Sequence, residues 1–126
     1  MLNISTRAQV LTGDNILIGG FIITGSDSKR VALFAKGPSL NSGSGPVPGR
    51  LADPFLELRD GDGNLITGND NWKDSPERAE IEASGIAPTN DLESAILRTV
   101  PPANYTAIVR GKNGPGVGVV EIYNLR

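Results

Sequence analysis

The chain has 126 residues, 38% of them hydrophobic, which suits one folded domain over residues 1–126. It contains no histidine and no cysteine, which excludes disulfides, thiolate metal sites, thiol nucleophiles and histidine-based proton transfer. The net charge is −2 with the signs interspersed, so no lysine and arginine cluster predicts nucleic-acid or anionic-membrane binding. The longest apolar stretch, residues 16–23, is too short to span a bilayer.

The N-terminal half is predicted to form short strands separated by turns, because its glycines and prolines are dispersed. Residues 2–10 alternate polar and apolar side chains, as a half-buried terminal strand does. Residues 16–23 are apolar on both faces, which favours a central sandwich strand, with a bulge or a close backbone approach at its two glycines. Residues 30–35 make a third strand. Residues 36–53, rich in Gly, Pro and Ser, form either a functional loop or a long surface connection.

The C-terminal half continues the same pattern. Residues 55–59 and 65–67 are predicted to pair as a hairpin around an acidic turn, and residues 93–100 to form a further strand. One short helix is expected near 76–84, capped by Ser75 and stopped by Gly85. Residues 105–110 and 117–123 are predicted to form a last hairpin. About eight strands at regular spacing indicate an all-β sandwich of jelly-roll type.

Oxygen donors of the kind that calcium prefers are concentrated between residues 53 and 74. An EF-hand counted from Asp60 fails, because Leu65 and Asn71 stand where glycine and glutamate are needed. The alternative is that these residues only build turns. No cofactor is required by the sequence, and Ca²⁺ is the one candidate. The candidate metal ligands are Asp60, Asp62, Asn69, Asp70 and Asp74.

Two aromatic residues are candidates for binding. Trp72 is the only tryptophan and could serve as a stacking platform for a sugar, with Tyr105 and the 36–53 loop completing the binding face. The alternative for Trp72 is a structural plug over an open end of the sandwich.

Catalysis is not expected. Ser39 and Ser94 have no histidine to act as a base, and neither is followed by a lysine in a Ser-x-x-Lys pattern. Glu80 and Glu82 are two apart on the predicted helix and do not face each other. A hydrolase that used carboxylates such as Glu93 would need two of them about 5–10 Å apart across a cleft.

Several phrases resemble a repeated all-β domain of large secreted and surface proteins of environmental bacteria. They are LNISTR, TGDNILIGGFIITG, KRVALFAKGPSL, LADPFLELRDGDGNLITGNDNW, GIAPTNDLESAI and NYTAIVRGKNGPGVGVVEIYNL, and together they cover residues 2–125. Residues 53–123 more distantly resemble the bacterial pre-peptidase C-terminal domain, some relatives of which bind calcium. That resemblance implies Asp60, Asp70 and Asp74 as ligands, although Asn71 stands where relatives often have a second aspartate.

Both resemblances imply a non-catalytic extracellular module. No signal-peptide pattern follows Met1, so the protein is either cytosolic or had a leader that this chain does not include. Because both resemblances imply an extracellular module, an extracellular or cell-surface location is expected. The sequence therefore predicts a structural or adhesive module, with itself or neighbouring modules as partners. End-to-end association into fibres could use the terminal strands, and the alternative is that the strand at residues 2–10 pairs within its own sheet. The second functional hypothesis is a carbohydrate- or protein-binding accessory module, calcium-dependent or not, from a secreted enzyme.

Overall fold

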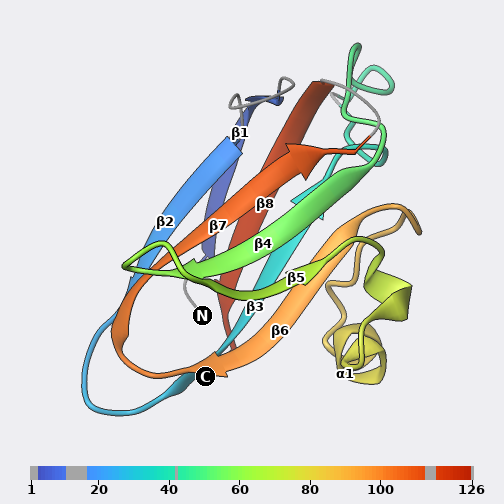
Figure 1. Cartoon of the computed structure of the whole chain (residues 1–126). Helices are drawn as coiled ribbons and strands as arrows, with labels where there is room; N and C mark the ends of the chain where they lie inside the picture. The colour runs from blue at the N-terminus through green and yellow to red at the C-terminus, as the bar shows by residue number, and fades with distance from the viewer. Residues whose placement is uncertain (1–2, 11–16, 42, 113–115, 126) are drawn as a thin grey trace.

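Two antiparallel sheets of four strands pack face to face in the computed structural model. The structure describes residues 17–41, 43–112 and 116–125, and it describes residues 3–10 by their backbone alone. Successive strands alternate between the sheets for much of the chain, and the two strand orders are those of a jelly roll, as predicted. Sheet A has the order β1 (Asn3–Val10), β8 (Gly116–Asn124), β3 (Lys29–Lys36), β6 (Ser94–Val100). Sheet B has the order β2 (Leu17–Ile23), β7 (Ala103–Gly111), β4 (Pro54–Asp60), β5 (Leu65–Asn69) (Figure 1).

The main core lies between the two sheets, where alternate side chains of β2, β3, β4, β7 and β8 point inward. On β4, for example, Leu56 and Leu58 are fully buried, while the intervening Glu57 is only partly covered. Strand β3 is buried on both faces, because Val31, Leu33 and Ala35 face the other sheet and the residues between them face a second cluster. Residues 31–35 (VALFA) are apolar without interruption because protein covers both faces of the strand there.

The second cluster lies on the outer face of sheet A and includes residues of a short 3-10 helix, η1 (Trp72–Asp74), and of the helix α1 (Arg78–Ala83). Figure 1 shows α1 beside β6. The helix was expected over 76–84 with Ser75 as its cap. It begins later, at Arg78, and Glu77 is the N-cap, without a side-chain hydrogen bond. Ser75 instead accepts a hydrogen bond from the backbone N–H of Glu77 and shapes the turn before the helix. The buried residues of this cluster are Ala32, Phe34, Trp72, Ile81, Ala95 and Leu97.

The position of β2 in its sheet differs from the prediction. It was predicted to be a central strand, but it lies at the edge of sheet B and pairs only with β7 among the described residues. Its outward side chains Ile18 and Ile22 are exposed. The register with β7 is continuous, so there is no bulge, and Gly19 allows a close approach instead: a Cβ there would lie 3.1 Å from a methyl carbon of Val120.

The predicted hairpin of β4 and β5 is present, but the predicted last hairpin is wrong. Strand β7 lies between β2 and β4 in sheet B, whereas β8 lies between β1 and β3 in sheet A. The two strands therefore face each other across the core and do not pair. Both strands are present where they were predicted, but their pairing depends on which sheet each strand joins.

The long connection over residues 37–53 links β3 in sheet A to β4 in sheet B. Leu40 and Val47 form a small apolar cluster with Val119, and Leu51 is fully buried in the main core. The backbone N–H of Leu51 donates a 2.7 Å hydrogen bond to the carbonyl of Val117 on β8. The segment crosses the end of the sandwich and is held there by Leu40, Val47 and Leu51.

Candidate functional site

The acidic turn between β4 and β5 is built around Asp60. Its Oδ1 accepts hydrogen bonds of 2.9 Å from the backbone N–H groups of Asp62 and Asn64, and the Asn64 amide lies 3.3 Å from Oδ2. The bond from the Asn64 backbone is the largest cause that lowers the pKa of Asp60 below its ordinary value. The carboxylate of Asp60 therefore holds the hairpin turn, which is the alternative reading of this motif.

Asn69, at the end of β5, joins the two sheets. Its Oδ1 accepts a 3.0 Å hydrogen bond from the backbone N–H of Ala95 on β6, and its Nδ2 donates to the carbonyl of Asn71. Both ends of this side chain are thus used by the fold. Asp62 is exposed on the β4–β5 turn and Asp74 is exposed at the end of η1, so the structure does not bring the five candidate ligands together.

Asp70 lies at the opposite end of β4 from Asp60, next to Asp53. Its Oδ2 accepts a 2.6 Å hydrogen bond from Lys112 Nζ, which follows β7. Asp53 is 7% exposed, and burial is the main cause that raises its pKa, followed by the negative charge of Asp70. Asp53, Asp70 and Asn71 each have a buried Oδ1 without a hydrogen-bond partner. Asp53 directly precedes β4, and Asp70 and Asn71 directly follow β5, so the three residues come from the open end of the β4–β5 hairpin.

Sequence reasoning did not select Asp53 as a candidate ligand. The signal was present in the hairpin, because Leu56 pairs with Asn69, so residues just before β4 lie opposite those just after β5. Among the described residues, no group of three or more aspartates and glutamates is placed to hold a metal ion. A cation here would have to use amide and carboxylate oxygens together and compete with the ammonium group of Lys112.

Both aromatic candidates are buried at 5% exposure. The indole of Trp72 lies in the cluster under α1, and Lys73 Nζ is 5.6 Å from its ring centroid. Tyr105 stacks on Phe21 in the main core with 5.3 Å between ring centroids, and its hydroxyl donates a 2.6 Å hydrogen bond to the carbonyl of Pro101. A sugar ring needs an open aromatic face for stacking, and protein covers these two rings.

Glu93 is the most buried ionisable residue among those described, with 0% exposure. Its Oε2 accepts three hydrogen bonds, from the backbone N–H of Gly37 (2.9 Å), the backbone N–H of Ser39 (3.0 Å) and the hydroxyl of Ser39 (2.7 Å). Ser94 Oγ lies 2.6 Å from the carbonyl oxygen of Pro54 and 2.7 Å from that of Asp70, and donates to them. The serines that might have acted as nucleophiles therefore tie loops to strands.

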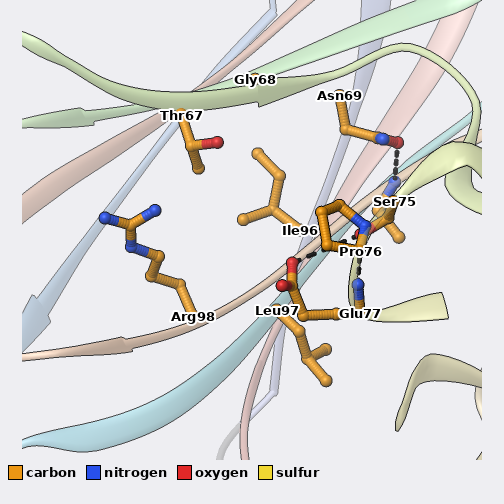
Figure 2. Close-up of a pocket in the computed structure, with 10 residues that line it drawn as sticks. Thr67, Gly68, Asn69, Ser75, Pro76, Glu77, Ile96, Leu97 and Arg98 are labelled. Atoms are coloured by element: carbon orange, nitrogen blue, oxygen red, sulfur yellow. Dashed lines mark hydrogen bonds between the residues drawn. The ribbon is translucent and has the colours of Figure 1, made fainter. Parts of the chain in front are cut away.

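A small pocket opens between β5 and β6 (Figure 2). Asn69 and the turn that Ser75 forms with Glu77 border it on one side, and Ile96 and Arg98 of β6 border it on the other. Its volume is about 50 Å³, whereas sites for drug-sized ligands usually measure about 300–1,000 Å³. The pocket can hold a water molecule or two, and it is too small for a sugar ring.

Comparison with solved structures supports the fold. The structure is similar to the pre-peptidase C-terminal domain of a collagenase from Bacillus anthracis, with a TM-score of 0.57 and 13% identity over 97% of this chain and 90% of that one. It also matches 14% of a GH115 4-O-methyl-α-glucuronidase at a TM-score of 0.38 and 16% identity. No family model and no curated protein matches the sequence. The pre-peptidase C-terminal likeness is therefore one of fold, and the resemblance to a repeated bacterial surface domain stays a prediction. The described residues include no helix that is long and apolar enough to cross a membrane.

Proposed function

We propose that this chain is a non-catalytic structural or adhesive module of a bacterial secreted or surface protein, located outside the cell, and that it associates with further copies of itself. The observation that carries the proposal is the pair of open sheets: each has four strands, and the described residues leave both edges of each sheet unpaired. Unpaired strand edges present rows of backbone N–H and C=O groups that bind other strands.

The state of the polar residues supports a role without covalent chemistry. The Ser39 hydroxyl is bound to the buried Glu93, and the Asp60 carboxylate is bound within its own turn. Arg30 binds Glu80 through two hydrogen bonds and so ties α1 to β3. Each of these polar groups is bound to another part of the same chain. The likeness to a domain of a collagenase supports a place within a larger secreted protein.

Association through the terminal strands would use β1. Along its whole length this strand pairs with β8 of its own sheet, from Asn3 opposite Tyr123 to Val10 opposite Gly116. One edge of β1 is thus satisfied within the chain, which was the alternative to pairing with a neighbour. Its other edge is unpaired among the described residues, and β6 is the corresponding edge on the far side of sheet A.

The test is the mass of the purified chain in solution, measured by light scattering over a range of concentrations, with negative-stain images of the same samples. We expect assemblies that exceed the monomer mass of 13.2 kDa and grow with concentration. A monomer at every concentration would contradict self-association and leave a recognition or spacer module.

A calcium-dependent binding module is the second candidate, and the three unpartnered oxygens of Asp53, Asp70 and Asn71 favour it. Ca²⁺ that binds the folded chain there should raise its melting temperature, because ligand binding stabilises the folded state. Asp53→Asn should abolish that rise, and Asp62→Asn, in the exposed β4–β5 turn, should keep it. If Ca²⁺ leaves the melting temperature of the unaltered chain unchanged, this candidate is rejected. If Ca²⁺ does raise the melting temperature, glycan and protein arrays with and without Ca²⁺ identify what the module binds.

A further inference from the structure

Exposed apolar side chains are concentrated on one sheet. The described residues include four large hydrophobic side chains that are exposed. Two of them, Ile18 (54% exposed) and Ile22 (65%), lie on β2, and a third, Leu65 (55%), lies on β5. The fourth, Leu92 (43%), lies in the loop before β6. Strands β2 and β5 are the two edge strands of sheet B, so three of the four lie where another strand could pair.

The edge strands of the two sheets differ in charge. Strand β2 has the sequence LIGGFII and β5 has the sequence LITGN, neither with a charged residue. On sheet A, β1 contains Arg7 and β6 contains Arg98. Charged residues and prolines on edge strands are a common protection against pairing with other chains. Sheet B lacks that protection on both sides.

The direction of the strands matches one edge of sheet B to the other. Sheet B has four strands, and each strand is antiparallel to its neighbours. The first and last strands, β2 and β5, therefore run in opposite directions at opposite edges of the sheet (Figure 1). A second copy in the same orientation therefore presents its β5 antiparallel to β2 of the first. The two surfaces in this contact are different, and such heterologous contacts produce open-ended assemblies when they do not close into a ring.

We propose that sheet B continues from one copy of this chain into the next, with the free edge of β2 paired to the free edge of β5 of a second copy. This inference rests on the proposed function and names the surfaces through which self-association occurs. Backbone hydrogen bonds across the new strand pair provide affinity, and Ile18, Ile22 and Leu65 become covered in the contact.

Three lysine variants test the contact by light scattering. Ile22→Lys places a charge on β2, Leu65→Lys places one on β5, and Leu92→Lys, in the loop before β6, is the matched control outside both strands. All three replace an exposed Leu or Ile, and circular dichroism verifies that each variant is folded. We expect the first two to lose the assemblies and return to the monomer mass, and Leu92→Lys to assemble as the unaltered chain does.

Cysteine cross-linking tests the pairing of β2 with β5 directly, because the chain has no cysteine of its own. An Ile22→Cys chain and a Leu65→Cys chain are mixed with a short bismaleimide cross-linker. We expect mixed dimers to predominate over dimers of either variant with itself. Predominant Ile22→Cys self-dimers would show a two-fold β2–β2 contact and overturn the proposal.

The outcomes separate this inference from the proposed function. Assemblies that persist in both Ile22→Lys and Leu65→Lys, without mixed cross-links, overturn the β2–β5 contact and leave self-association through other surfaces standing. An unaltered chain that is monomeric and forms no mixed cross-links overturns both. If the unaltered chain is monomeric and an unrelated extended peptide binds the β2 edge, the second copy is the wrong occupant and the inference fails.

Discussion

The hydroxyl of Ser39 donates a 2.7 Å hydrogen bond to Oε2 of Glu93, a residue 54 positions further along the chain. The same oxygen accepts the backbone N–H groups of Gly37 and Ser39, and the backbone carbonyl of Glu93 accepts that of Trp72. A single buried residue therefore ties the loop after β3, the start of β6 and the 3-10 helix η1 to one another.

Glu93→Ala should lower the free energy of unfolding by about 3 kcal/mol, because it leaves the N–H groups of Gly37 and Ser39 without an acceptor in a buried site. Urea denaturation measures the change. Glu82→Ala is the control: its ion pair with Arg78 is on the surface, with both side chains 49% exposed, and should contribute less than about 0.5 kcal/mol. Equal effects of the two substitutions would contradict the structural role of Glu93.

Trp72→Ala should destabilise the chain by about 3–5 kcal/mol, because it removes a large side chain from the cluster beneath α1 and leaves a cavity. Trp72→Phe retains part of the packing and should cost less. Thermal unfolding is measured together with retention on immobilised glycans. An unchanged melting temperature combined with lost glycan retention would instead identify Trp72 as a sugar platform.

Gly37→Ala should destabilise the chain strongly, whereas Gly20→Ala should be neutral or add up to about 1 kcal/mol of stability. A Cβ on Gly37 would overlap the backbone carbonyl oxygen of Leu51, and backbone atoms cannot move aside as a flexible side chain can. A Cβ on Gly20 would have its nearest neighbour, the carbonyl oxygen of Tyr105, 4.0 Å away. Chemical denaturation of the two variants compares them, and equal stabilities would show that the loop at Gly37 relaxes.

Asp53→Asn should stabilise the chain at pH 7, and the gain should shrink as the pH falls toward 4. Burial raises the pKa of Asp53 in the folded chain above its ordinary value of 3.8, so the folded state binds the proton more tightly than the unfolded state. Stability from this group is therefore present below pH 3.8 and is lost as the pH rises through the raised pKa.

Urea denaturation of Asp53→Asn and of the unaltered chain between pH 3 and pH 8 measures this effect. Asp62→Asn is the matched control on the exposed turn, and its profile should follow that of the unaltered chain. A stability gain from Asp53→Asn that stays constant over the whole range would contradict an effect of the ionised carboxylate.

The positions of the strands could be predicted from the sequence because alternation of side chains is local. Strands were predicted at residues 2–10, 93–100 and 117–123 from local sequence patterns, and the structure has strands at Asn3–Val10, Ser94–Val100 and Gly116–Asn124. The turn at Asp60 was also predictable, because its hydrogen bonds join residues at most four apart. The all-β sandwich followed from these local signals together with the absence of long helical patterns.

Pairing partners and the composition of the polar site depend on contacts between distant residues. Strands β7 and β8 follow each other closely, yet each joins a different sheet, and the alternation along a strand contains no information about its partner. Strand β2 is apolar on both faces, which predicted a central position, but it is an edge strand of sheet B and its outward side chains are exposed. Asp53 meets Asp70 because β4 and β5 fold back on each other, and Ser39 meets Glu93 because two loops meet at one end of the sandwich. Periodicity indicates whether a residue's own side chain is buried, whereas the residue that this side chain contacts is decided by the tertiary structure.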